Sequence, residues 1–242
     1  MAKFKKLMKK FWITVWEYIK GSFLSVFMYM CASSILLMLT VQSGEELSLT
    51  WDSGKITWTV VCIVAAAAYN FFVMWAHGGN QYEMLVSGNV KRDSGYYMST
   101  HKEEKEYRPW KGFIIGAVIS LWCIAVAIIF GCNQAKIDGK ELSGALSIVT
   151  IISFFVSGWS ILPLYYMNAS GIAVSYFLSC LFALIPIVVS GGAYIGGAYG
   201  RRNKAIREQQ IADAAAKAAE EKAKNKKINY GGLPGTKPRK RK

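Results

Sequence analysis

The sequence predicts an all-α protein, a polytopic membrane helical bundle with about five hydrophobic helices. Three observations predict this fold class. Of the 242 residues, 53% are apolar or aromatic and only 18% are charged. The apolar residues form blocks of about 20, the length of helix that crosses the hydrocarbon core of a bilayer. Between and beyond these blocks lie three segments that hold 26 of the 29 lysines and arginines, a clustering typical of membrane topology signals.

Residues 1–20 have the pattern of a basic amphipathic interfacial helix. Their apolar side chains recur at helical spacing, and lysines crowd the opposite face, as in helices that lie in the plane of a membrane surface. The alternative is a basic flank of the first span. We expect four of these lysines to contact anionic lipid head groups: Lys5, Lys6, Lys9 and Lys10.

Residues 21–200 form the predicted transmembrane helical bundle. The predicted spans cover about 21–41, 56–75, 113–130, 143–163 and 171–194, and a polar loop covers 76–111. The first block is too long for a cleaved signal peptide and lacks a small-residue cleavage site. The prediction therefore treats it as a retained span.

The 76–111 loop contains the only two histidines. Tyr82–Val86, followed by Ser-Gly-Asn, predicts a small hairpin, and residues 99–106 predict a short polar helix. His77, His101 and Glu104 are the candidate residues for a site in this loop. A metal site needs three or four ligands, and no further ligand stands at suitable spacing, so we predict neither a metal nor a cofactor.

Beyond the bundle, residues 201–224 predict an Ala-rich helix, because Ala is a strong helix former and charge pairs recur at i, i+4 spacing. Residues 225–242 predict a disordered basic tail. Arg201 and Arg202 are further candidates for contact with anionic lipid. Nucleic acid or ribosome contact by the tail is an alternative that has weaker support, because Tyr230 is its only aromatic residue for base stacking.

Hydropathy and charge disagree about the number of crossings. Five spans would place the N-terminus and the basic tail on opposite sides, whereas the positive-inside rule places the N-terminus, the 76–111 loop and the tail all in the cytoplasm. The conflict lies in residues 142–200, 59 residues without a charge. This block crosses once with a re-entrant or interfacial remainder, crosses three times in short helices, or leaves the tail outside. The prediction favours a cytoplasmic tail.

Two patterns inside the apolar blocks are candidates for special roles. Gly192, Gly196 and Gly200 lie four residues apart and predict a glycine-zipper face for close helix packing, within the chain or between subunits. Asn70 and Asn168 are the strongly polar residues in or beside the blocks, where no ionisable side chain occurs.

These features favour a multi-pass protein of the cytoplasmic membrane that acts as a non-enzymatic scaffold or accessory subunit. Its expected partners are the bilayer, anionic lipid head groups, and a second copy or another membrane subunit. One alternative is a permease or channel subunit for a small solute or ion, with an uncharged path. Another alternative is a membrane enzyme that uses the 76–111 loop, and it is weaker because the loop shows no catalytic constellation.

Overall fold

The computed structural model describes residues 2–41, 51–86, 90–91, 101–102, 107–139 and 144–229. This part of the chain is helical, apart from a two-residue parallel pairing of β1 (Val90–Lys91) with β2 (His101–Lys102). Five helical segments are long and apolar enough to cross a membrane, so the prediction of an all-helical chain with five such helices is confirmed. The chain divides into two compact units, Met1–Tyr199 and Gly200–Lys242.

The first unit begins with two long helices that pack against each other, α1 (Ala2–Val41) and α2 (Ser53–Val86). The predicted interfacial helix and first span are thus one uninterrupted helix. Asp52 caps α2, because its Oδ1 accepts the backbone N–H of Lys55 at 2.8 Å. Since α2 continues to Val86, the predicted hairpin is wrong at residues 82–86. Tertiary packing extends this helix, which buries Gly78, Gly79 and Gln81.

The other elements of the first unit are shorter. In chain order, the remaining helices are α3 (Lys111–Cys132), α4 (Gln134–Asp138), α5 (Gly144–Ala169), the 3-10 turn η2 (Tyr176–Leu178), α6 (Ser179–Phe182) and α7 (Leu184–Asn229). The first part of α7 runs antiparallel to α3, since Gly116 lies against Ile187 and Gly112 lies against Tyr194. Only residues 184–199 of α7 belong to this unit.

Helix α5 turns back on itself at Ser157, whose φ of −122° and ψ of 16° are not helical. The rings of Phe154 and Tyr165 lie 5.3 Å apart, centroid to centroid. In a straight helix these two residues would be separated by about 16 Å along the axis. Helix α5 is therefore a hairpin of two short helices, with Ser157 at its tip.

Two features of the sequence explain this turn. Pro163 lacks a backbone N–H, and its ring crowds the carbonyl of Trp159 four residues earlier, which distorts a helix on the N-terminal side of the proline. The backbone N–H of Trp159, freed by the turn, donates instead to Ser33 Oγ of α1 at 3.0 Å. A hydrogen bond from another helix thus replaces the one that α5 loses.

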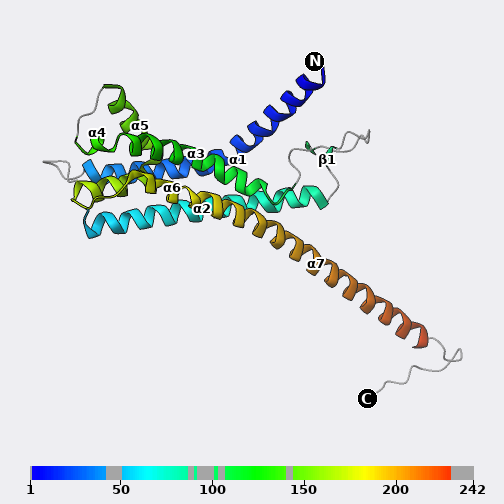
Figure 1. Cartoon of the computed structure of the whole chain (residues 1–242). Coiled ribbons are helices and arrows are strands. Elements are labelled where there is room, and N and C mark those ends of the chain that lie inside the picture. Colours follow the sequence, from blue (N-terminus) through cyan, green and yellow to red (C-terminus); the bar gives the residue numbers. More distant parts are fainter. Residues whose placement is uncertain are drawn as a thin grey trace. The chain divides into compact units, whose positions relative to one another are not determined.

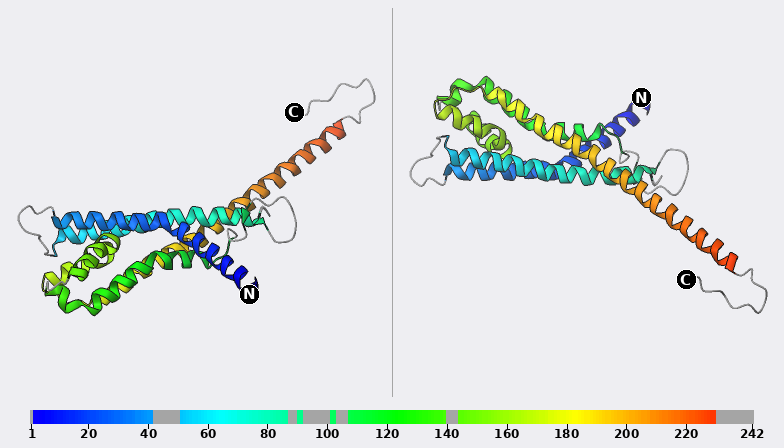
Figure 2. Two further views of the ribbon diagram at one scale, coloured as in Figure 1. Left: turned by 90° about the horizontal axis from the view of Figure 1, so that it is seen from above. Right: turned by 90° about the horizontal axis from the view of Figure 1, so that it is seen from below.

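The bundle has two ends. We call the end near Tyr18, Gln81 and Lys111 the proximal end, and the end near Leu36 and Phe130 the distal end. The α5 hairpin enters from the distal end, where Tyr166 OH donates to Leu36 O at 3.1 Å. Its tip reaches only the middle of α1, where the Trp159 ring packs against the Tyr29 ring with the centroids 4.7 Å apart. Helices α1, α2 and α3 run the length of the bundle, as does the segment from η2 to Tyr199 (Figures 1 and 2).

The break predicted at residues 163–171 is displaced in the structure. Residues 158–169 are helical, Pro163 included, and the chain turns at Ser157 and again between Ser170 and Ser175. At the other end of α7, residues 225–229 are helical, whereas the prediction began the disordered tail at 225. Residues 230–242 lie outside the described residues.

Candidate functional site

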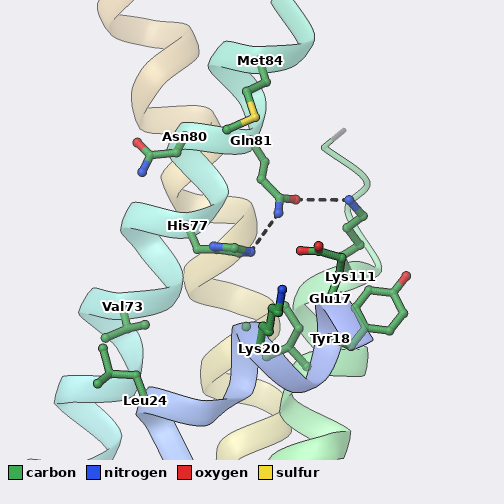
Figure 3. A pocket seen from close by; sticks show the side chains of 12 residues that line it. Glu17, Tyr18, Lys20, Leu24, Val73, His77, Asn80, Gln81, Met84 and Lys111 are labelled. Atoms are coloured by element: carbon green, nitrogen blue, oxygen red, sulfur yellow. Dashed lines mark hydrogen bonds between the residues drawn. The ribbon is translucent and has the colours of Figure 1, made fainter. Parts of the chain in front are cut away.

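A pocket of about 370 Å³ opens at the proximal end between α1, α2 and α3 (Figure 3). Its lining residues are Glu17, Tyr18, Lys20, Gly21, Leu24, Val73, His77, Asn80, Gln81, Met84, Lys111 and Ile115. Polar and charged side chains occupy one part of the wall. Leu24 and Val73 lie together at the opposite part, and the pocket is therefore amphipathic.

Gln81 of α2 organises the polar wall. Its Oε1 accepts from Tyr194 OH at 2.5 Å and from Lys111 Nζ at 3.3 Å. Because Lys can only donate, these contacts fix the orientation of the amide, and Gln81 Nε2 must donate to His77 Nε2, which lies 2.8 Å away. His77 therefore accepts through Nε2 and carries its proton on Nδ1. One buried amide thus joins α2 to both α3 and α7.

Glycines allow Tyr194 to approach Gln81 so closely. A Cβ at Gly78 would clash with the backbone carbonyl of Tyr194, and a Cβ at Gly112 would lie 2.6 Å from Tyr194 Cβ. The Tyr194 ring is fully buried and stacks on Tyr107 at 5.2 Å with an interplanar angle of 12°. Tyr107 in turn meets Tyr82 edge to face at 5.8 Å. Burial, together with neighbouring Tyr199 and Tyr82, raises the pKa of Tyr107, so its phenol stays protonated at neutral pH.

The charges of the pocket wall are of both signs. Figure 3 shows the side chains of Glu17, Lys20, His77 and Lys111 directed into the same space. Lys111 is only 4% exposed, whereas Lys20 is exposed and Glu17 is half-buried. Glu17 forms no ion pair within the part of the chain that the structure describes. The wall thus carries two ammonium groups and one carboxylate that has no cationic partner there.

Asn70 lies in the bundle interior and is fully buried. Its Nδ2 donates to Ser190 Oγ at 2.9 Å, and Ser190 Oγ lies 3.3 Å from Asn70 Oδ1. The pair joins α2 to α7, and each of the two buried side chains has a hydrogen-bond partner in the other. The structure therefore gives Asn70 a helix-packing role.

Asn168 closes the turn between α5 and η2 at the distal end. Its Oδ1 accepts from Val174 N at 2.6 Å and its Nδ2 donates to Val174 O at 2.8 Å. Gln134 of α4 donates to the same carbonyl at 2.9 Å, and Tyr176 OH donates to Asp138 Oδ1 at 2.6 Å. Asn168 thus belongs to a polar cluster that fixes the loop, far along the bundle from Asn70.

Serines surround the tip of the α5 hairpin. Ser157 Oγ donates to Cys123 Sγ at 3.3 Å, and Ser160 Oγ donates to Ser157 O at 2.9 Å. Ser179 Oγ donates to Ser160 Oγ at 3.1 Å, while Ser120 Oγ donates to the backbone carbonyl of Ala183. These buried hydroxyls connect α5 to α3 and α6.

The predicted site in the 76–111 loop stays a prediction, because only part of it lies within the described residues. His77 lies in the pocket, His101 lies in β2, and Glu104 is outside the described residues. Within the described ranges no three His, Cys, Asp or Glu side chains could hold a metal ion. The predicted lipid-contacting residues Lys5, Lys9, Lys10 and Arg202 are exposed and Arg201 is half-buried, whereas nothing is described of the Lys6 side chain.

The three glycines of the predicted zipper have different environments. A Cβ at Gly196 would lie 2.7 Å from the Trp75 ring, whereas a Cβ at Gly192 would meet nothing within 4 Å. Gly200 is exposed. Within the chain, the close approach of α7 to α2 is made by Gly197, whose Cβ would clash with the carbonyl of Trp75. That the face of Gly192, Gly196 and Gly200 packs against a second molecule stays a prediction.

The sequence interpretation missed Glu17, Gln81, Lys111 and Tyr194. One signal was present, because Glu17 is the only acidic residue among the first 44. Gln81 and Lys111 lay within the predicted loop, and only the fold brings them to one wall. No protein-family model, curated protein or solved structure matches this sequence.

We expect the Asn70–Ser190 pair to contribute measurably to stability. In a double-mutant cycle of Asn70→Ala and Ser190→Ala, the coupling free energy should be about 1 kcal/mol, as for hydrogen bonds between membrane helices. The measurement is thermal or denaturant unfolding of the purified chain in detergent. Asn70→Ala combined with Ser160→Ala, which does not contact Asn70, should give a coupling near zero. Equal coupling in both cycles would contradict the assignment.

Proposed function

We propose that this chain is a multi-pass membrane protein. The distribution of its side chains supports the proposal, because the bundle carries large apolar residues outside and hydroxyls inside. Phe23, Met38 and Phe72 are 69–70% exposed, whereas Ser33 and Ser160 are fully buried. An apolar surface of this extent is unfavourable in water and favourable in lipid.

We further propose four crossings, made by α1, α2, α3 and the segment from η2 to Tyr199, with α5 as a re-entrant hairpin. The observation that carries this proposal is the turn at Ser157, which returns α5 to the distal end. The end of α2 at Val86, the start of α3 at Lys111 and Tyr199 of α7 then share the proximal end, and the basic segments of the sequence adjoin these positions and the start of α1. The positive-inside rule places that end in the cytoplasm, and charge no longer conflicts with the number of crossings.

The proposed role is that of a non-enzymatic scaffold or accessory subunit. The second unit supports it, since its residues 200–229 are helical and the side chains described there, up to residue 224, are exposed apart from the half-buried Arg201. It carries charges of both signs, including a Lys204–Glu208 pair at 3.8 Å. This helix also exposes the apolar side chains of Ile206 and Ile211, at 43% and 69%, which supports contact with another molecule. The bundle would anchor this helix at the membrane.

Cysteine labelling tests the topology. The native Cys132 is exposed and is the last residue of α3, at the distal end. The other four cysteines are replaced by Ala. We expect a membrane-impermeant maleimide to label Cys132 and an added Ile172→Cys in intact cells. It should label an added Lys224→Cys only after permeabilisation. Cys132→Ser gives the background, and labelling of Lys224→Cys from outside would contradict four crossings.

The scaffold role is tested through the exposed helix. Ala215→Pro should break this helix without touching the bundle, because proline costs about 3 kcal/mol in a helix interior. We expect the full chain, purified in mild detergent, to retain a partner or a second copy that Ala215→Pro loses and the control Ala215→Ser keeps. A monomer without any bound partner in both variants would count against the scaffold role.

A further inference from the structure

The proximal pocket combines two environments that meet at the surface of a bilayer. Glu17, Lys20 and Lys111 supply charge, while Leu24 and Val73 supply an apolar wall. Its volume of about 370 Å³ lies within the range of small-ligand sites and far above that of a single water molecule. In the proposed membrane placement, the charged part would lie at the level of the lipid head groups and the apolar part at the start of the acyl chains.

The charges of the pocket wall favour a ligand that carries both a negative and a positive group. Lys20 and Lys111 attract a phosphate, but the Glu17 carboxylate in the same space would repel a ligand that is only anionic. A ligand that carries a phosphodiester and an ammonium group satisfies both signs. The Glu17 carboxylate accepts hydrogen bonds, which a primary ammonium can donate and a quaternary ammonium cannot, and it therefore favours the primary one.

We propose that this pocket binds a phospholipid whose head group is a phosphodiester with a primary amine, as in phosphatidylethanolamine. The phosphate lies between Lys20 and Lys111, the ammonium meets Glu17, and an acyl chain leaves past Leu24 and Val73. The proposal rests on the membrane placement of the bundle. It concerns one built pocket and is separate from contact of the exposed terminal lysines with anionic lipid.

Native mass spectrometry of the full chain in detergent tests the assignment. Dioleoyl phosphatidylethanolamine, phosphatidylcholine and phosphatidylglycerol are added separately, and the apparent affinity of the first bound lipid is measured. We expect the ethanolamine lipid to bind about fivefold more tightly than the choline lipid, because both head groups are cationic but only the primary ammonium can donate a hydrogen bond to Glu17. In Glu17→Gln this ratio should fall to about one. The control Glu208→Gln, the same change in the exposed helix, should leave it unchanged.

A second variant covers the case in which Glu17→Gln does not fold. Lys20→Gln, at an exposed position, should weaken the binding of all three lipids alike, because each contains the phosphate. Equal affinities of the three lipids in the wild type, or an unchanged ratio in Glu17→Gln, would overturn the proposal. Equally tight binding of soluble glycerophosphoethanolamine would overturn the assignment to a lipid.

The proposed membrane placement has its own readout. Alkaline carbonate should leave the chain in the membrane fraction. If the chain stays there but shows no head-group preference, the pocket assignment fails and the membrane placement stands. If carbonate extracts the chain, both fail.

Discussion

Gly197→Val is expected to abolish the stable bundle. A Cβ at this position would clash with the backbone carbonyl of Trp75 and lie 3.1 Å from the backbone nitrogen of Gly79. Neither atom belongs to a side chain that could move aside, so α7 and α2 would have to separate. We expect the free energy of unfolding to fall by about 3 kcal/mol or more, at the upper end for overpacked cores. Thermal unfolding in detergent measures it.

Gly192→Val is the matched control on the same helix. It makes the same change to the helix backbone, but a Cβ there meets nothing within 4 Å. We therefore expect the monomeric bundle to keep its stability. If Gly192→Val instead disrupts an oligomer, the predicted face of Gly192, Gly196 and Gly200 is used between molecules. If both variants are equally stable, the close approach of α2 and α7 is wrong.

The glycine segment illustrates what the sequence could and could not predict. The four-residue spacing of Gly192, Gly196 and Gly200 predicted close helix packing in this part of the chain, and α7 does approach α2 and α3 closely there. Gly196 of the predicted face lies against the Trp75 ring. The backbone of α2 at Trp75 and Gly79 is instead approached by Gly197, which is outside that face. Local spacing contains no information about which face meets a helix that is more than 100 residues away in sequence, so the partner could not be predicted.

In the charge-free block from 142 to 200, too, the structure depends on a partner that lies far away in sequence. The length of this block and the basic tail beyond it gave conflicting predictions of the number of crossings, and a re-entrant segment was one of three alternatives. The turn itself could not be located, because a Ser-Gly pair in an apolar helix is common. At Ser157 the turn is stabilised by Ser33 of another helix, and only the folded bundle provides that partner.

The pocket could be predicted least. Its charged residues come from α1 and α3, and its organising amide comes from a part of α2 that the sequence interpretation placed in a loop. Gln81 is helical because tertiary packing extends α2. Individual residues such as Glu17 could be recognised as unusual, but their convergence depends on three helices packing at once.

The hairpin is tested by Trp159→Ala, the second variant with a large expected effect. Trp159 is 1% exposed, packs against Tyr29 with the ring centroids 4.7 Å apart and meets Phe182 edge to face at 6.4 Å. Removing the indole leaves a cavity between α1, α5 and α6 at the tip of the hairpin. Buried Trp→Ala substitutions cost about 3–5 kcal/mol, part of it from the cavity. Unfolding in detergent measures the loss.

Trp122→Ala is the control, because Trp122 on α3 is 46% exposed and carries the same side chain. We expect a much smaller loss of stability there. The reactivity of Cys123 in Trp159→Ala also distinguishes a hairpin from a straight α5. If α5 is a hairpin held at its tip, Trp159→Ala should raise the reactivity of the buried Cys123, whose Sγ accepts from Ser157, well before global unfolding. A straight α5 that crosses the bilayer would not place Ser157, Cys123 and Trp159 in one cluster, and Cys123 would then stay protected until the whole bundle unfolds.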